Sequence, residues 1–198
     1  ARCSRAHAAA RADCRRDLKA GEADIAIRYA SKPPAVGVSW ELMRDTFHVV
    51  ASPILVGATR RMLSPAELAS LPLIESEWPP TDLNAPSWRR WQREAGLRHE
   101  TVPDFTSLAS LSFREELHAI EAAIAGQGVA ICSDVLIAPE LASGTLVPVS
   151  RITLPGYGFY IVYRSGHPKL SSIKAFSAWI RSTAEDPRKA TGASDARP

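Results

Sequence analysis

Polar side chains that could bind a small anion follow two of the apolar runs in this sequence. Arg28 and Tyr29 come directly after one short run, and Ser133 and Asp134 come directly after another. In α/β proteins, ligands bind beyond the carboxyl ends of such strands, where backbone N–H groups and polar side chains meet them. An arginine guanidinium at such a place binds a carboxylate through charge-assisted hydrogen bonds. These residues therefore predict a site for an anionic molecule, such as a carboxylate or an amino acid.

Three further residues belong to the same predicted site. Ser52 ends an apolar run immediately before a proline, and Phe113 and Arg114 precede or open a predicted helix. Arg114 would add a second guanidinium for an anion. Each arginine has a structural alternative, because a surface arginine also covers apolar atoms with its stem. Ser133 could equally cap the helix that follows it, and helix capping accounts fully for Asp134.

Binding sites of other kinds fit the sequence less well. Gly126-Gln127-Gly128 ends a helix, whereas a dinucleotide-binding loop must open one. Cys3, His7 and Cys14 have the spacing of no standard zinc site and no fourth ligand nearby. We therefore expect neither a nucleotide cofactor nor a bound metal.

The residues that could perform catalysis are also poorly arranged. Cys132 lies in an apolar run, where a buried and inert thiol is expected. His118 would meet it only by a coincidence of folding, so a Cys–His nucleophile is not favoured. Glu115 and Glu116 are adjacent and point in different directions, which makes them a poor acid–base pair. We therefore predict that the protein is not an enzyme and uses no cofactor.

Composition limits the class of protein. The chain has 198 residues, 45% of them hydrophobic and 23% charged, which is typical of a soluble globular protein with one large domain or two small lobes. No apolar run reaches the roughly 18–20 residues of a membrane helix. Residues 1–16 lack the apolar core of a signal peptide, and the three cysteines are odd in number, so we expect a cytoplasmic protein with reduced thiols. Arg and Lys side chains are scattered and the net charge is only +3, so no concentrated basic face for nucleic acid is predicted.

Short apolar runs alternate with helical patterns, which is typical of α/β layers with mostly parallel sheets. Ser64 and Glu67 form a capping-box pattern around Pro65 and predict the start of a helix. Trp88 and Trp91 lie one helical turn apart and are expected in the core rather than at a ligand site. Strands are predicted at residues 24–28, 46–52, 71–74, 129–132, 146–149 and 159–163. Apolar side chains at helical spacing predict the buried faces of two further helices, Leu117, Ile120 and Ile124 in one and Leu170, Ile173, Phe176 and Ile180 in the other.

Two places have the pattern of crossings between lobes, the strand that ends at Ser52-Pro53 and the strand after Gly156. Two crossings would make the middle of the chain one lobe and the outer segments the other. The predicted parts are an unassigned N-terminal segment (1–16), lobe I (17–52 plus 157–184), lobe II (53–156) and a disordered tail (185–198).

Several segments resemble the LysR-type transcriptional regulators, in matching order and spacing. The run from Leu18 to Arg28 is similar to the family's L-x-x-G-x-x-D-x-A-I-R segment, and Ser52-Pro53-Ile54-Leu55 is similar to its S-P-x-L. The other similar segments are Ala122–Ile131, Leu141–Val147 and Phe176–Ile180. The resemblance covers residues 17–181 and is greatest for the glycine-cleavage-activator-like branch of the family.

The resemblance implies a particular fold and function. Members have two Rossmann-like lobes in a periplasmic-binding-protein-like fold of type II, and a small effector binds between the lobes. Complete members also have an N-terminal winged helix-turn-helix that binds DNA. This chain begins inside the first lobe of that pattern, so the resemblance implies an incomplete first lobe, no direct DNA binding and a weak dimer at most. The expected role is the sensing of a small-molecule effector in transcription regulation, with closure of the lobes as the response.

Two other functions stay open at this stage. A solute-binding protein of a transporter would share the fold, although the sequence shows no signal peptide. An inactive truncated fragment would account for the unassigned residues 1–16.

Overall fold

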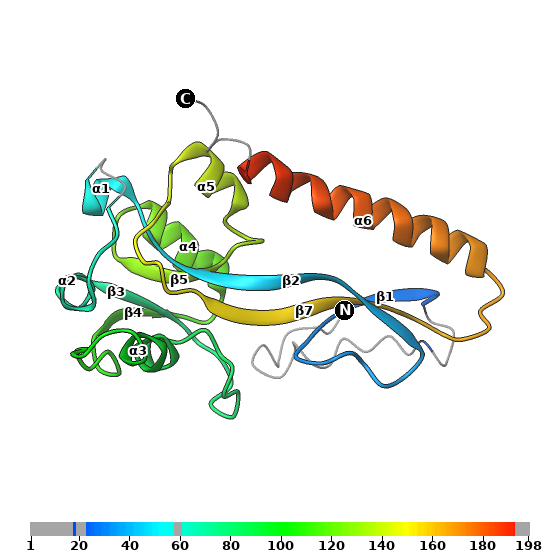
Figure 1. Cartoon of the computed structure of the whole chain (residues 1–198), viewed down its shortest axis with the longest axis horizontal. Coiled ribbons are helices and arrows are strands. Elements are labelled where there is room, and N and C mark those ends of the chain that lie inside the picture. Colours follow the sequence, from blue (N-terminus) through cyan, green and yellow to red (C-terminus); the bar gives the residue numbers. More distant parts are fainter. Residues whose placement is uncertain (1–17, 19–22, 58–60, 193–198) are drawn as a thin grey trace, which may run out of the picture. The chain divides into compact units, whose positions relative to one another are not determined.

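The computed structural model describes residue 18 and residues 23–57 and 61–192, with side chains described up to residue 183 (Figure 1). The described residues form two compact units. Unit 1 contains residues 46–156, and unit 2 contains the segments before residue 46 and after residue 156. Among the described residues, no helix is long and apolar enough to cross a membrane.

Unit 1 is built on a mixed sheet. Its strands are the last part of β2 (Val38–Ala51), then β3 (Leu73–Ser76), β4 (Ala109–Phe113), β5 (Val129–Ser133) and β6 (Val147–Pro148). The order is β2-β5-β3-β4, with β6 paired to β2. β3 is parallel to β4 and β5, whereas β2 is antiparallel to β5 and β6. Of the mostly parallel strands that the sequence predicts, β3, β4 and β5 are parallel neighbours, and helical crossovers connect them. The pairing of β2 with β5 and β6 is antiparallel instead.

Alternate residues of these strands enter two separate cores, one on each face of the sheet. Phe47, Val49, Val129 and Ile131 belong to the first core, together with α3 (Trp88–Gly96). Their neighbours Val50, Ala130 and Cys132 belong to the second core, which α4 (Glu116–Ile124) and α5 (Ala138–Ser143) cover. Figure 1 shows α4 and α5 on one side of this sheet and α3 on the other. Unit 1 is thus a three-layer α/β/α body.

Two of the predicted apolar patterns in unit 1 are confirmed and one is corrected. All five residues of β5 are buried, as expected for a strand covered on both faces. Trp88 and Trp91 are each 1% exposed, so they are core residues as predicted. Leu117, by contrast, is 59% exposed. The residues of α4 that are buried are Glu116, Ala119, Ile120, Ala122 and Ala123.

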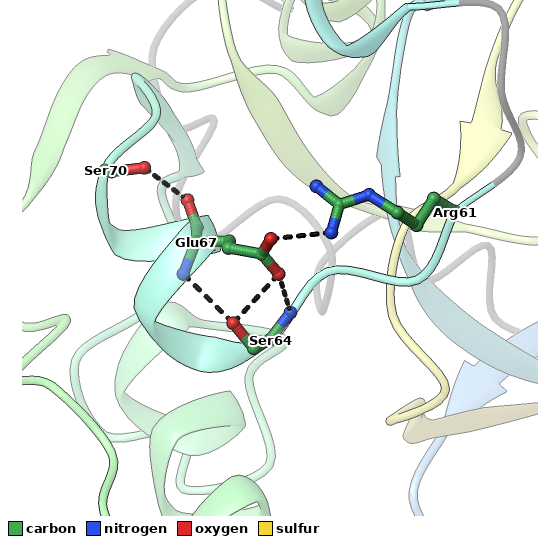
Figure 2. A network of polar contacts seen from close by, with 4 residues as sticks. All are labelled: Arg61, Ser64, Glu67 and Ser70. Atoms are coloured by element: carbon green, nitrogen blue, oxygen red, sulfur yellow. Dashed lines mark hydrogen bonds and ion pairs between the residues drawn. The ribbon is translucent and has the colours of Figure 1, made fainter.

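The start of α2 (Pro65–Ala69) is a capping box, as the sequence predicts (Figure 2). The Ser64 hydroxyl accepts a hydrogen bond from the Glu67 amide at 3.3 Å, and Glu67 Oε2 accepts one from the Ser64 amide at 2.8 Å. Arg61 donates to the other carboxylate oxygen at 2.6 Å. The Ser64 amide and then Arg61 hold the pKa of Glu67 at about 2. The carboxylate therefore stays ionised and in place at any pH near neutrality.

Replacing Ser64 with alanine is expected to reduce the free energy of unfolding by about 1 kcal/mol, because the Glu67 amide then loses its partner. Urea denaturation of both proteins measures the change. Ser64→Thr, which keeps the hydroxyl, should lie closer to the wild type. Equal stability of the alanine variant and the wild type would contradict a stabilising role for the cap.

Unit 2 contains β1 (Ile25–Ala30), the first part of β2 and most of β7 (Leu154–Tyr163), in the order β1-β7-β2. β1 and β7 are antiparallel, and Arg28 lies opposite Tyr160. The long helix α6 (Leu170–Gly192) follows. Ile173 of α6 is buried as predicted, but Phe176 is 39% exposed, so the predicted buried face is wrong at that position.

α6 continues as far as Gly192, past residue 185, where the sequence predicts that a tail begins. Residues 193–198 lie outside the described part of the chain, as do nearly all of residues 1–22.

A polar cluster ties the start of β1 to the start of α6. Asp24, from the D-x-A-I-R run, lies 2.9 Å from Lys169 Nζ and 3.1 Å from His167 Nε2. The other ring nitrogen of His167 accepts a hydrogen bond from the Lys169 amide at 3.1 Å. The hydrogen bond from Lys169 lowers the pKa of Asp24. The cluster thus joins the residue just before β1 to the residues just before α6.

Candidate functional site

Ser133 and Glu116 join the end of β5 to the first turn of α4. The Ser133 amide donates a hydrogen bond of 2.8 Å to Glu116 Oε1, and both residues are buried, with 3% and 6% exposure. This bond brings two predicted site segments, 113–114 and 133–134, close together in unit 1. It also places a buried carboxylate where the sequence predicts an anionic ligand. Glu116 was not among the predicted site residues, because only the fold shows which strand end meets this helix.

Asp134 pairs with β2 rather than with a helix. Its Oδ1 accepts a hydrogen bond from the Thr46 amide at 3.1 Å, and its own amide donates to the Thr46 carbonyl at 2.8 Å. The residue at the N-cap of α5 is Ile137, with no side-chain cap bond. The predicted capping roles of Asp134 and Ser133 are therefore wrong for α5. The Ser133 carbonyl instead accepts bonds from the amides of Leu136 and Ile137, which form a turn.

Ser52 is the N-cap of α1 (Pro53–Val56) and is 2% exposed. Its hydroxyl accepts a hydrogen bond from the Ile54 amide at 3.3 Å, and its carbonyl accepts one from the Leu55 amide at 2.9 Å. These bonds are local, so they account for a serine here without a ligand.

Phe113 is the last residue of β4, and Arg114 lies between β4 and α4. The Phe113 carbonyl accepts a hydrogen bond of 2.8 Å from the Glu77 amide, and its ring meets His118 edge-on at 6.5 Å. The Arg114 side chain is 86% exposed and lies 3.8 Å from Glu77. An exposed pair at that distance adds little stability. The guanidinium therefore stays accessible to an anion from solvent.

Arg28 and Tyr29 are the predicted residues in unit 2, and both are partly buried on β1. The Tyr29 hydroxyl donates a 2.7 Å hydrogen bond to Asp45, which is 3% exposed. The Tyr29 ring also packs against Phe159, with ring centres 4.7 Å apart, and against Tyr157 at 5.3 Å. The hydroxyl and ring of Tyr29 thus have structural partners of their own.

A second feature of unit 1 lies on its α3 side. A broad groove of about 1840 Å³ adjoins a smaller hollow of about 530 Å³. Glu75 of β3 lines both, and burial raises its pKa to about 7. An acid with a strongly raised pKa in a concave site is a mark of functional residues. The sequence gives little sign of it, because an acid after two apolar residues also fits an exposed strand position.

Residues considered for other chemistry are placed as follows. Burial raises the pKa of the Cys132 thiol well above its usual value, and the nearby Glu116 charge adds to this, so the thiol is unreactive. His118 packs on Phe113. Within the described residues no group of His, Cys, Asp and Glu side chains could hold a metal. Cys3, His7 and Cys14 lie outside the described residues.

Comparison with protein families and curated relatives shows what the chain resembles. The LysR substrate binding domain family model matches residues 5–185. The glycine cleavage system transcriptional activator of Escherichia coli (strain K12) is 30% identical over 173 residues, covering 85% of this chain and 52% of the relative. The AhcY transcriptional activator HvrB of Rhodobacter capsulatus is 33% identical over 170 residues, covering 85% and 53%. The chain thus spans about half the length of the curated relatives it matches.

Solved structures give the same fold. The effector domain of the transcriptional regulator AmpR of Pseudomonas aeruginosa superposes with a TM-score of 0.62 at 24% identity, covering 89% of this chain and 79% of that one. Full-length LysG of Corynebacterium glutamicum with bound effector Arg gives a TM-score of 0.53 at 19% identity, covering 83% and 53%. The chain therefore belongs to the LysR substrate-binding domain family, the effector-binding regulatory domains of LysR-type transcriptional regulators, with a periplasmic-binding-protein-like α/β fold of type II.

Proposed function

We propose that this domain senses a small anionic effector, a carboxylate or an amino acid, and thereby controls transcription in the cytoplasm. The observation that supports this most strongly is the family match over residues 5–185, joined to relatives that are transcriptional activators. Binding would act by favouring one conformation of the domain, in proportion to the effector's differential affinity. We further propose that the domain associates as a weak dimer and does not contact DNA itself.

The proposed effector contacts lie in both units. In unit 2 they are Arg28, as the anion-binding side chain, and Tyr29. In unit 1 they are Ser52, Phe113, Arg114, Ser133 and Asp134. Exposure of Arg114 supports its part in this set, and the bond between Ser133 and Glu116 supports a fixed position for the end of β5.

The arrangement around Ser133 also limits how an anion would bind in unit 1. Its amide already donates to the Glu116 carboxylate. A ligand carboxylate at the same amide would meet a like charge in a buried place, which is unfavourable. We therefore expect the anionic group of the effector to be held by Arg28 or Arg114 rather than by the end of β5.

Isothermal titration of the purified chain with small carboxylates and amino acids tests the proposal. We expect at least one member of the panel to bind, and Arg28→Gln to weaken it by about tenfold or more, since a charge-assisted hydrogen bond is lost. Arg98→Gln, an exposed arginine beyond α3, is the matched control and should bind as the wild type does. If no compound binds to well-folded protein, the proposed sensing role is wrong.

A further inference from the structure

Glu77 lies directly beside Arg114, one of the proposed effector contacts. Glu77 follows the last residue of β3 and Arg114 follows the last residue of β4, and the parallel pairing of Ser76 with Phe113 brings the two next to each other. The Glu77 amide donates a 2.8 Å hydrogen bond to the Phe113 carbonyl, a backbone contact that leaves the Glu77 side chain free to point elsewhere. Both side chains line the broad groove of unit 1. An acid and a base thus lie together at the carboxyl ends of two adjacent strands.

The two side chains neutralise each other only weakly. Arg114 Nε lies 3.8 Å from Glu77 Oε2, which is too far for a hydrogen bond, and the side chains are 86% and 53% exposed. Glu77 Oε1 accepts a 3.3 Å hydrogen bond from the Ser112 hydroxyl. Among the residues that the structure describes, no group donates to Glu77 Oε2 and none accepts from the Arg114 guanidinium. Both groups are therefore able to bind a ligand.

The acid beside Arg114 opposes the binding of a simple carboxylate. A carboxylate bound to Arg114 would lie within a few ångströms of the Glu77 carboxylate, and the exposed Glu115 lines the same groove. Like charges at this distance repel each other. A binding site can select one ligand by repelling another in this way. A ligand that also contains a positive group replaces the repulsion with an attraction, because that group contacts Glu77.

The short distance between the acid and the base also limits how far apart the charges of the ligand can be. In an α-amino acid the ammonium and carboxylate groups are attached to the same carbon atom, so they can contact an acid and a base that lie side by side. In a linear ω-amino acid, methylene groups separate the two charges. Such a molecule would have to fold back on itself to make both contacts. The arrangement of Glu77 and Arg114 therefore fits an α-amino acid best.

We propose that Glu77 is a specificity-determining residue of the effector site, where its carboxylate binds the ammonium group of an α-amino acid whose carboxylate is bound by Arg114. This inference rests on the proposed function and narrows it from carboxylates and amino acids in general to α-amino acids. The acid and the base exchange a weak contact with each other for charge-assisted hydrogen bonds to the ligand. Glu77 also excludes the carboxylates that lack an amino group.

Isothermal titration with matched compounds tests the role of Glu77. The panel contains the common amino acids and the carboxylates that lack their amino groups, such as propionate for alanine and glutarate for glutamate. We expect at least one amino acid to bind, about tenfold or more tightly than its matched carboxylate, since only the amino acid makes both charged contacts. β-Alanine and γ-aminobutyrate, whose charges lie farther apart, should also bind more weakly than this amino acid.

Variants separate the charge of Glu77 from a structural role. Glu77→Gln should weaken the best amino acid by about tenfold and should tighten its matched carboxylate, because the attraction and the repulsion are both lost. Loss of a merely structural residue would weaken both compounds. Glu77→Asp keeps the charge and should keep the preference. Glu100→Gln, which removes another exposed acid of the same groove, should keep it as well. Arg114→Gln should weaken both compounds.

The outcomes distinguish this inference from the proposed function. Carboxylates or ω-amino acids that bind as tightly as the α-amino acids would overturn the role of Glu77 and leave the sensing role standing. An unchanged preference in Glu77→Gln, or an unchanged affinity in Arg114→Gln, would overturn it too, because the ligand then lies away from these two residues. If no compound binds to well-folded protein, the proposed function and this inference are both wrong.

Discussion

Replacing Trp88 with alanine is expected to reduce the free energy of unfolding by about 3–5 kcal/mol, the usual cost of removing a buried aromatic side chain. Trp88 is 1% exposed and packs on both Trp91 and Phe105, with ring centres 5.8 Å and 5.6 Å away. The variant also leaves the buried Ile74 carbonyl without the indole hydrogen bond. Since Trp88 connects α3 to β3, the loss should loosen the whole first core.

Trp179→Ala is the matched control for this experiment. Trp179 is 60% exposed on α6, so its removal should change stability by less than about 1 kcal/mol. Chemical denaturation followed by circular dichroism measures both variants. Similar losses for the two tryptophans would contradict the arrangement of the first core.

Glu75→Gln is expected to stabilise the protein, and the gain should grow as the pH rises. The pKa of Glu75 is about 7 in the folded protein and near 4.5 when unfolded. The stability that this group contributes is fully present below pH 4.5 and is lost as the pH rises through about 7. With allowance for partial exposure, the wild type should lose roughly 2–3 kcal/mol from this source, and the glutamine variant should not.

Denaturation of both proteins at a series of pH values measures this difference. Other charged side chains around the groove remain in both proteins, so their effect cancels; they are Glu77, Asp82, Arg89, Arg90, Arg93, His99, Glu100, Arg114 and Glu115. Glu121→Gln, at an exposed position, should keep the wild-type dependence on pH. If the free energy of unfolding of the glutamine variant depends on pH as that of the wild type does, burial does not raise the pKa of Glu75 in the folded protein.

Local patterns in the sequence predict the local structure well. The capping box at Ser64 and Glu67, the buried run before Ser133 and the buried tryptophans of α3 all depend on residues close together in the chain. The family resemblance is confirmed as well, because it depends on several such segments in order. These features follow from hydrogen bonds and periodicities that a short segment contains by itself.

Features that depend on distant neighbours could not be predicted in this way. Leu117 is exposed because the side of α4 that contains Ala119, Ala122 and Ala123 is the buried one, and the periodicity of the larger apolar residues does not show this. Asp134 bonds to Thr46, 88 residues away in sequence, instead of capping a helix. Glu116 accepts a hydrogen bond from the Ser133 amide at the end of β5, and Glu75 accepts one from the Trp88 amide at the start of α3. Both contacts form only when the chain has folded. The proposed effector contacts remain predictions for the same reason, since long-range packing decides which polar groups face a ligand.

The discontinuous make-up of unit 2 has a consequence for biosynthesis. The described part of unit 1 comes from a single region of the chain, residues 46–57 and 61–156, whereas unit 2 needs β1 from before it and β7 and α6 from after it. Because a ribosome delivers the chain from its N-terminus, unit 1 is complete while β1 still lacks its antiparallel partner. The unpaired edge of β1 must then wait for roughly the last quarter of the chain, and during this interval it is open to pairing with other chains.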